Sequence, residues 1–293
     1  MKPVDFDYER PATIEEALRL LGGRSAQTKI LAGGQSLVPL LVTRALRPLF
    51  ILDVGRIPEL RNIRRDGGWI RIGAAVTQTD CAASPVVRAG CPLLAEAIGW
   101  VASPQVRNLG TVGGSLAQRN AISEIPTVAA AVGARLLLVD DQGRRREVAV
   151  EAFLDKDGDE TLRPNELLLE AAFPADDGRG AWDFLEVQRR HAHYALVGVA
   201  VSFGVDAAGA IVGPRVAAGG IAPSAVRISS VENRLLGQLP SEALFEDVSG
   251  LAVSDPRMQP ADDLHATADY RRRVTPAVIR RSLSRALARC SAA

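Results

Sequence analysis

Two short glycine turns, far apart in the sequence, constrain the fold of this chain more than any other feature. The first reads Ala32-Gly33-Gly34-Gln35-Ser36, and the second reads Thr111-Val112-Gly113-Gly114-Ser115. The first follows the apolar run 29–31, and both lead into apolar segments, which is typical of a tight turn before a helix. Backbone N–H groups in such a turn can converge on an anion, because glycine places no Cβ in the way. These first and second glycine loops together predict a site for one diphosphate.

Neither glycine loop has the spacing of a common nucleotide-binding motif. Both lack the G-x-G-x-x-G of a Rossmann fold and the G-x-x-x-x-G-K-[ST] of a P-loop. We therefore expect a nucleotide site of another design.

The apolar pattern predicts an α+β chain whose two halves differ. Thr13-Ile14-Glu15-Glu16 is a capping box that begins a helix, and Gly22-Gly23 ends it. In the first half we expect strands at 50–54 and 69–73, a hairpin of 135–139 with 146–150, and a strand at 166–168. In the second half we expect strands at 184–188, 195–205 and 212–221, then helices from 228 that end in a basic helix at 276–289. The polar segment 174–180 separates the halves, so the 293 residues predict two domains, 1–176 and 177–293.

Composition and charge exclude several classes of function. The chain has 35 basic and 34 acidic residues, a balance that favours neither nucleic acid nor a membrane surface. No run approaches the roughly 18 apolar residues that a membrane span needs, and the start of the chain has no signal-like apolar region, so we expect a cytoplasmic protein. The three cysteines are scattered without a C-x-x-C, which argues against zinc, an iron–sulfur cluster or a disulfide scaffold.

Residues that could carry catalysis or hold a metal do not form a recognisable set. The sequence has no G-x-S-x-G and no H-E-x-x-H, and His191 and His193 have no third ligand close in sequence. We therefore expect no metal site and no catalytic side chain, so that a cofactor supplies the chemistry.

The two glycine loops and their spacing resemble those of the FAD-binding medium subunits of molybdenum hydroxylases, of the carbon monoxide dehydrogenase and xanthine dehydrogenase type. The resemblance extends over nearly the whole chain, because the second half carries similar motifs at 194–197, 218–223 and 269–272. It implies a vanillyl-alcohol-oxidase-type (PCMH-type) FAD-binding domain of two subdomains, followed by a C-terminal sheet-and-helix domain.

The resemblance also implies the binding residues. Both glycine loops, 32–36 and 111–115, are expected to touch the FAD, mainly through backbone N–H groups around its diphosphate. Glu124 stands where the family has an acidic residue after the second loop, and Tyr194 where it has an aromatic residue near the flavin ring. We expect the FAD to be non-covalent, because the first histidine is His191 and the cysteines lie outside both loops.

In such an enzyme this chain would be an electron-transfer subunit. It would pass electrons from a small [2Fe-2S] subunit through FAD to an external acceptor, and a large molybdopterin subunit would carry out hydroxylation, in a dimer of heterotrimers. Two alternatives remain open at this stage: a self-sufficient FAD-dependent oxidase or dehydrogenase, and a flavin-free assembly subunit. The substrate and the acceptor are left open as well.

The sequence departs from the family after the second glycine loop. The family pattern is roughly A-H-A-D-P-A-A-[DE]-x-P, and here residues 118–121 read Gln-Arg-Asn-Ala. Asn120 replaces a charged aspartate and Arg119 adds a positive charge, so we expect FAD binding with an altered redox potential. In the terminal helix, Arg280, Arg281, Arg285 and Arg289 are candidates for a surface that docks a partner.

Overall fold

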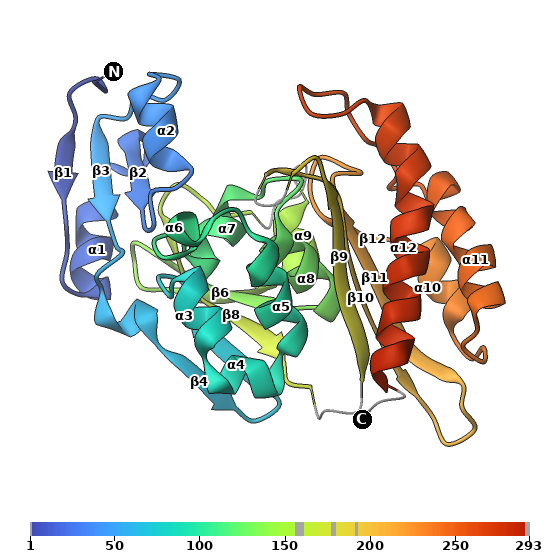
Figure 1. Ribbon diagram of the computed structural model, residues 1–293. Helices are drawn as coiled ribbons and strands as arrows, with labels where there is room; N and C mark the ends of the chain where they lie inside the picture. The colour runs from blue at the N-terminus through green and yellow to red at the C-terminus, as the bar shows by residue number, and fades with distance from the viewer. Residues whose placement is uncertain (1, 156–160, 177–179, 191–192, 291–293) are drawn as a thin grey trace.

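The computed structural model describes residues 2–155, 161–176, 180–190 and 193–290. Three β-sheets follow one another across the molecule in the order of the chain, with helices beside and between them (Figure 1). This mixed architecture confirms the predicted α+β class. No helix in the described ranges is long and apolar enough to cross a membrane.

The N-terminal sheet is small and parallel, in the order β1-β3-β2. Its strands are β1 (Asp7–Glu9), β2 (Thr28–Leu31) and β3 (Phe50–Asp53). Parallel neighbours cannot be joined by a tight turn, so helical segments connect them. These segments are α1 (Ile14–Leu21), the 3-10 turn η1 (Ser25–Gln27) and α2 (Leu37–Val42). The predicted capping box begins α1: the Thr13 hydroxyl accepts from the Glu16 amide at 3.1 Å, and the Glu16 carboxylate accepts from the Ala12 amide at 2.7 Å.

The central sheet is antiparallel and has the order β4-β5-β8-β6-β7. Its strands are β4 (Ile63–Asp66), β5 (Trp69–Gly73), β6 (Arg135–Asp140), β7 (Arg145–Ala149) and β8 (Glu166–Pro174). The predicted hairpin of β6 and β7 is confirmed. The strand expected at 166–168 is longer, because β8 lies between β5 and β6 and pairs with both along its length. The helical segments of this unit are η2 (Pro58–Arg61), α3 (Gln78–Ala83), α4 (Pro85–Gly90), α5 (Pro92–Trp100), α6 (Pro104–Arg107), α7 (Val112–Gln118), α8 (Glu124–Val132) and α9 (Val150–Leu154).

The C-terminal sheet is antiparallel and has the order β12-β11-β10-β9. Its strands are β9 (Ala181–Gln188), β10 (Ala195–Val205), β11 (Ile211–Gly219) and β12 (Val226–Arg227). Four helical segments follow β12 along the chain: α10 (Ser229–Leu235), α11 (Glu242–Gly250), η3 (Leu251–Ser254) and α12 (Ala268–Cys290). Figure 1 shows α10, α11 and α12 on one face of this sheet, and α5 and α8 on the other.

Both faces of the C-terminal sheet are therefore buried. Side chains alternate along β10, so Val197 and Val199 pack into a core with α12, while Ala200 packs into the core of the central unit with Val128 of α8. This shared core fixes the C-terminal sheet against the central unit, and a residue of β9 or β10 can face α8 across the join.

The last helix begins earlier than the sequence predicted. The sequence predicts a final basic helix over 276–289, but α12 spans Ala268–Cys290 with Pro276 inside it. The turn before the proline is held by side chains: the Thr275 hydroxyl donates to the Arg271 carbonyl at 2.7 Å, and Arg271 is itself buried and hydrogen-bonded. These contacts stabilise the helical turn that precedes the proline.

Candidate functional site

The first glycine loop connects β2 to α2 and has free backbone donors. Gly34 has a φ of 74°, the left-handed region that favours glycine. Its carbonyl accepts the Val38 amide at 2.9 Å, which starts α2. The amides of Gly34, Gln35 and Ser36 donate no hydrogen bond within the part of the chain that the structure describes. Unpaired N–H groups side by side at a turn are suited to an anion.

The second glycine loop is constructed differently, because most of its amides are already used. Thr111 caps α7, and its hydroxyl accepts from the Gly114 amide at 3.0 Å. The Val112 and Gly113 amides donate to the carbonyls of Val76 and Ala74, each at 3.0 Å. Thr111 is also buried, and the Ser115 hydroxyl accepts from Gln78 Nε2 at 3.0 Å, so this loop offers an exposed Gly114 rather than a row of free amides.

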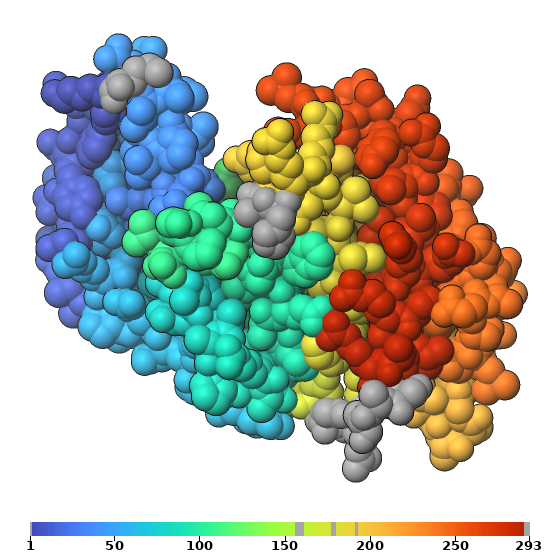
Figure 2. Space-filling model, in the orientation of Figure 1, coloured from blue at the N-terminus to red at the C-terminus, as the bar shows by residue number. Residues whose placement is uncertain are grey.

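The fold brings the first glycine loop against the backbone of residues 109–110, directly before the second glycine loop. A Cβ on Gly33 would lie 2.1 Å from the Leu109 carbonyl oxygen and 2.8 Å from the Gly110 Cα, so only glycine fits there. Two segments that are far apart in sequence therefore form one surface. Figure 2 shows a notch between the blue N-terminal unit and the yellow and orange segments of the C-terminal unit, with green residues of the central unit below it. Both α2 and α7, which follow the loops, lie at this side of the molecule (Figure 1).

The three C-terminal motifs named above meet around one buried arginine. Arg271 of α12 donates through Nη1 to the carbonyl oxygens of Leu196 at 2.6 Å and Gly220 at 3.2 Å. The Gly220 amide in turn donates to the carbonyl of Ala121 at 2.7 Å, in the segment between α7 and α8. The motifs therefore lie beside the segment that follows the second glycine loop.

Tyr194 lies directly before β10, at the start of the motif 194–197. Its side chain is 62% exposed, and its ring centroid lies 5.2 Å from that of His265. Asp263 holds the His265 segment by accepting its amide at 2.8 Å, and accepts from Arg271 at 2.6 Å. The sequence did not connect His265 with Tyr194, since the two residues lie far apart along the chain.

Glu124 lies at the start of α8 and faces a second carboxyl group that the sequence did not single out. Burial raises the pKa of Glu124 to about 7, while its own amide and Arg107 act in the opposite direction. Glu186, on the α8 side of β9, is only 6% exposed, and neither of its carboxyl oxygens has a hydrogen-bond partner among the described residues. Burial, together with the charge of Glu124, raises the pKa of Glu186 to about 9. A charged residue within the expected strand 184–188 was the one sequence signal for it.

The residues that depart from the family pattern lie between α7 and α8. Arg119 ends α7 with a φ of 48°, and its Nη1 atom is buried without a partner among the described residues. The Asn120 side chain accepts the Ile122 amide at 3.2 Å, which stabilises the turn locally. A buried guanidinium nitrogen without an acceptor is costly, so a group outside this chain is the expected partner of Arg119.

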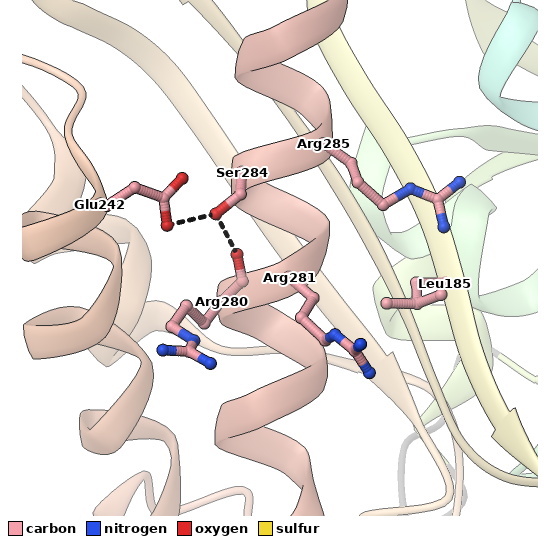
Figure 3. A pocket seen from close by; sticks show the side chains of 6 residues that line it. All are labelled: Leu185, Glu242, Arg280, Arg281, Ser284 and Arg285. Carbon is pink, nitrogen blue, oxygen red and sulfur yellow. Dashed lines mark hydrogen bonds between the residues drawn. The ribbon is translucent and has the colours of Figure 1, made fainter.

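The arginines of the terminal helix are mostly engaged within the chain. Arg285 and Arg289 contact Glu96 of α5 and Asp183 of β9, and Arg280 pairs with Glu246 of α11. An open groove beside α12 is lined by Leu185, Glu242, Arg280, Arg281, Ser284 and Arg285 (Figure 3). Leu185 is on the α12 face of β9, so this groove is separated by the sheet from the glycine loops.

No group of three or more histidine, cysteine, aspartate or glutamate side chains that could hold a metal is present in the described ranges. His193 lies within these ranges, whereas His191 lies outside them.

Comparison with known proteins assigns the chain to a family. Residues 4–176 match the family described as "FAD binding domain in molybdopterin dehydrogenase". The chain belongs to this family. Residues 182–286 match a second family, "CO dehydrogenase flavoprotein C-terminal domain". The resemblance drawn from the glycine loops and the C-terminal motifs is thereby confirmed.

Relatives match along the whole chain. The carbon monoxide dehydrogenase medium chain of Hydrogenophaga pseudoflava is 35% identical over 99% of this chain and 100% of its own length. The 6-hydroxypseudooxynicotine dehydrogenase complex subunit alpha of Paenarthrobacter nicotinovorans is 37% identical over 99% of this chain and 97% of its own length. Among solved structures, carbon monoxide dehydrogenase from Hydrogenophaga pseudoflava aligns with a TM-score of 0.93 at 35% identity, over 99% of this chain and 100% of that chain. This flavoprotein is therefore an FAD-binding medium subunit of the molybdenum hydroxylase type and an oxidoreductase component.

The described residues fit FAD on physical grounds as well. Free amides at Gly34–Ser36 suit the negative charge of a diphosphate, and the exposed Gly114 lets a ligand approach the backbone. The unpartnered nitrogen of Arg119 and the exposed ring of Tyr194 add a cation and an aromatic face. These groups together suit an anionic, aromatic cofactor.

Proposed function

We propose that this flavoprotein transfers electrons from iron–sulfur clusters of a partner subunit, through FAD, to an external acceptor. The observation that carries the proposal is the close approach of Gly33 to residues 109–110, directly before the second glycine loop, which sets the free amides of the first loop near an exposed glycine turn. FAD supplies the chemistry when bound, because it exchanges electrons singly or in pairs. The residues of this chain bind the cofactor, orient it and set its electrostatic surroundings.

We propose a division of roles among the residues around the cofactor. The amides of Gly34, Gln35 and Ser36 would donate to the diphosphate, with Ala32 and Gly33 fixing the turn. In the second loop, Gly114 and the Ser115 hydroxyl would contact the cofactor, Thr111 would hold the turn by capping α7, and Val112 and Gly113 anchor the loop to residues 74–76. Tyr194 would lie against the flavin ring, and Glu124 would lie nearby.

We also propose the assembly and the place of the protein. The partners would be a small [2Fe-2S] subunit and a large molybdopterin subunit, in a dimer of heterotrimers in the cytoplasm. The names of relatives support partner subunits, since they include a "medium chain" and a "dehydrogenase complex subunit alpha". The boundary between domains 1–176 and 177–293 is supported by the two matched ranges, 4–176 and 182–286.

The test is the absorbance spectrum of the chain purified after co-expression with the genes beside its own. We expect a flavin spectrum, and acid precipitation should leave the yellow colour in the supernatant, because no covalent attachment is expected. A colourless protein would instead favour a flavin-free assembly subunit. A yellow protein that purifies alone and oxidises an organic substrate with oxygen would favour a self-sufficient oxidase.

A further inference from the structure

The short helix α2, which follows the first glycine loop, exposes apolar side chains. Val38 and Leu40 are 44% and 39% exposed, Pro39 is exposed between them, and Leu41 is the buried residue of the helix. Leu109, directly before the second glycine loop, is 58% exposed. Exposed apolar residues that gather at one place on a surface are typical of an interaction site. We call Val38, Pro39, Leu40 and Leu109 the α2 patch.

The α2 patch adjoins the first glycine loop. A Cβ on Gly34 would lie 3.1 Å from the Val38 Cγ2 atom, and a Cβ on Gly33 would lie 2.1 Å from the Leu109 carbonyl oxygen. The helix α2 is on the side of the N-terminal unit that faces the notch (Figures 1 and 2). A protein bound to the α2 patch would therefore lie beside the proposed cofactor site.

The chain around the α2 patch is strongly basic. Between Glu16 and Asp53 the sequence has no acidic residue, and its basic residues there are Arg19, Arg24, Lys29, Arg44 and Arg47. Since the whole chain has 35 basic and 34 acidic residues, the rest of the chain is net acidic. Positive charge is therefore concentrated in the segment that contains α2.

Two of these cations, in the turn after α2, are available to a partner. The Nε atom of Arg44 donates to the Lys2 carbonyl at 3.1 Å, and the Nε atom of Arg47 donates to the Arg44 carbonyl at 3.2 Å. Neither guanidinium pairs with a carboxylate among the described residues. The turn and α2 carry the chain roughly 10 Å from the glycine loop, so these charges lie apart from the proposed diphosphate contacts.

An apolar patch with an unpaired basic border suits a protein face that is apolar at its centre and acidic at its rim. A second copy of the same patch would instead bring like charges together. A [2Fe-2S] cluster held by four thiolates adds negative charge, about −2 when oxidised and about −3 when reduced. We propose that the α2 patch, with Arg44 and Arg47 at its border, docks the iron–sulfur subunit beside the flavin. This inference rests on the proposed function.

The first test is photo-crosslinking within the complex purified after co-expression. The photoreactive residue p-benzoylphenylalanine replaces Leu40, and mass spectrometry identifies what it captures. We expect an adduct with the iron–sulfur polypeptide. The same residue in place of Leu236, which is 55% exposed at the end of α10 in the C-terminal unit, is the matched control and should give no such adduct.

The second test measures how much iron–sulfur polypeptide a tag on this chain recovers. Leu40→Asp should lower the recovery about tenfold, because the new carboxylate would be desolvated without a partner at the centre of the interface. Leu236→Asp should recover as much as the wild type. Flavin absorbance relative to protein absorbance should be unchanged in both variants, because the free amides of the first glycine loop are untouched.

Arg47→Glu tests the basic border with a change that leaves the apolar patch intact. It should lower the recovery in about 0.05 M NaCl, and the difference from the wild type should shrink in about 0.5 M NaCl, because salt screens exposed charges. Arg65→Glu reverses an exposed arginine on β4 and is the matched control. It should follow the wild type at both salt concentrations.

The outcomes separate this inference from the proposed function. A wild-type chain that recovers no iron–sulfur polypeptide overturns the proposed assembly. A complex that forms but gives an adduct at position 40 with the molybdenum polypeptide, with a second copy of this chain or with nothing overturns the docking surface alone. Loss of FAD from Leu40→Asp with full recovery of the iron–sulfur polypeptide also overturns it, since the patch would then belong to the cofactor site. If Leu40→Asp does not fold, Arg47→Glu decides, and recovery equal to that of Arg65→Glu overturns the basic border.

Discussion

Gly34 allows a sharp test of the first glycine loop at the scale of a single residue. Its φ of 74° is unfavourable for any residue with a Cβ, at a cost of about 1–2 kcal/mol, and a Cβ there would lie 3.1 Å from Val38. Gly34→Val should therefore reorient the free amides of Gln35 and Ser36. We expect a folded protein that has lost most of its FAD, measured as flavin absorbance relative to protein absorbance.

Gly67→Val is the matched control for this change. Gly67 has a φ of 56° in the turn between β4 and β5, and no atom lies within 4 Å of the place its Cβ would take. The backbone strain is similar, but the turn is remote from both glycine loops, so this variant should keep its FAD. Equal FAD content in the two variants would remove the first loop from the site.

Arg119 should influence the redox potential of the bound flavin. A positive charge beside a flavin favours its reduced form, because reduction adds negative charge. Arg119→Ala should therefore lower the reduction potential, measured by titration against dyes of known potential. Arg65→Ala, which removes an exposed arginine on β4, should leave the potential unchanged. An unchanged potential in Arg119→Ala would mean that this guanidinium lies away from the flavin.

Residues whose role is set by their own backbone could be predicted from the sequence, and residues whose role is set by distant partners could not. Gly34 stands in a strand-to-helix turn, and its left-handed φ follows from that local context. Glu186 and His265 acquire their surroundings from Glu124 and Tyr194, which lie on other segments. Neither pairing has a sequence spacing that could be recognised.

At the scale of elements, the contact between β9 and α8 should make stability depend on pH. The pKa of Glu186 is raised in the folded protein, so the unfolded chain loses this proton at lower pH than the folded chain does. The protonated Glu186 therefore contributes stability that is fully present below pH 4.5 and is lost as the pH rises toward about 9. The loss amounts to about 3 kcal/mol by pH 7. Glu186→Gln should lose less free energy of unfolding over this range than the wild type, as measured by urea denaturation. Glu147→Gln should follow the wild type, and identical curves for all three proteins would contradict the burial of a proton at Glu186.

The packing of α12 against α5 and β9 depends on an ion network. Arg289 donates to both carboxylate oxygens of Glu96, at 2.6 and 2.7 Å, and to the fully buried Asp183 at 3.1 Å. Arg289→Ala should lower the free energy of unfolding by about 1.5–3 kcal/mol, the range for hydrogen bonds to charged groups. Arg281→Ala, on the same helix, removes an arginine with no partner among the described residues and should cost less than about 0.5 kcal/mol. Equal costs in chemical denaturation would show that the network contributes no more than a surface charge.

The helices and strands of this fold were predictable where local signals were complete. The hairpin of β6 and β7 has its polar turn between two apolar runs, and α1 has its capping box. The start of α12 was predicted wrongly, because the turn before Pro276 is held by Arg271, whose partners lie on β10 and beyond β11. The extent of β8 likewise depends on pairing with β5 and β6.

At the scale of the whole molecule, the C-terminal sheet and the FAD-binding unit form one body. Phe184 and Ala200 of the sheet pack in the same core as Leu94 and Val128 of the central unit. Proteolysis should therefore not readily release a stable C-terminal fragment. We propose that the cofactor site lies at the notch between the units, where an electron donor would approach the flavin from outside (Figure 2).

The last prediction concerns what this chain does without its partners. We propose no side chain beside the flavin that would activate an organic substrate. The isolated chain, reconstituted with FAD, should therefore be reduced by artificial one-electron donors and have little activity toward organic substrates. A tag on this chain should recover an iron–sulfur polypeptide and a larger molybdenum polypeptide in equal proportion after co-expression. Loss of substrate-dependent reduction on removal of the iron–sulfur polypeptide, with dithionite reduction retained, would place this chain downstream of those clusters. Substrate-dependent reduction of the isolated chain at the rate of the complex would contradict that order.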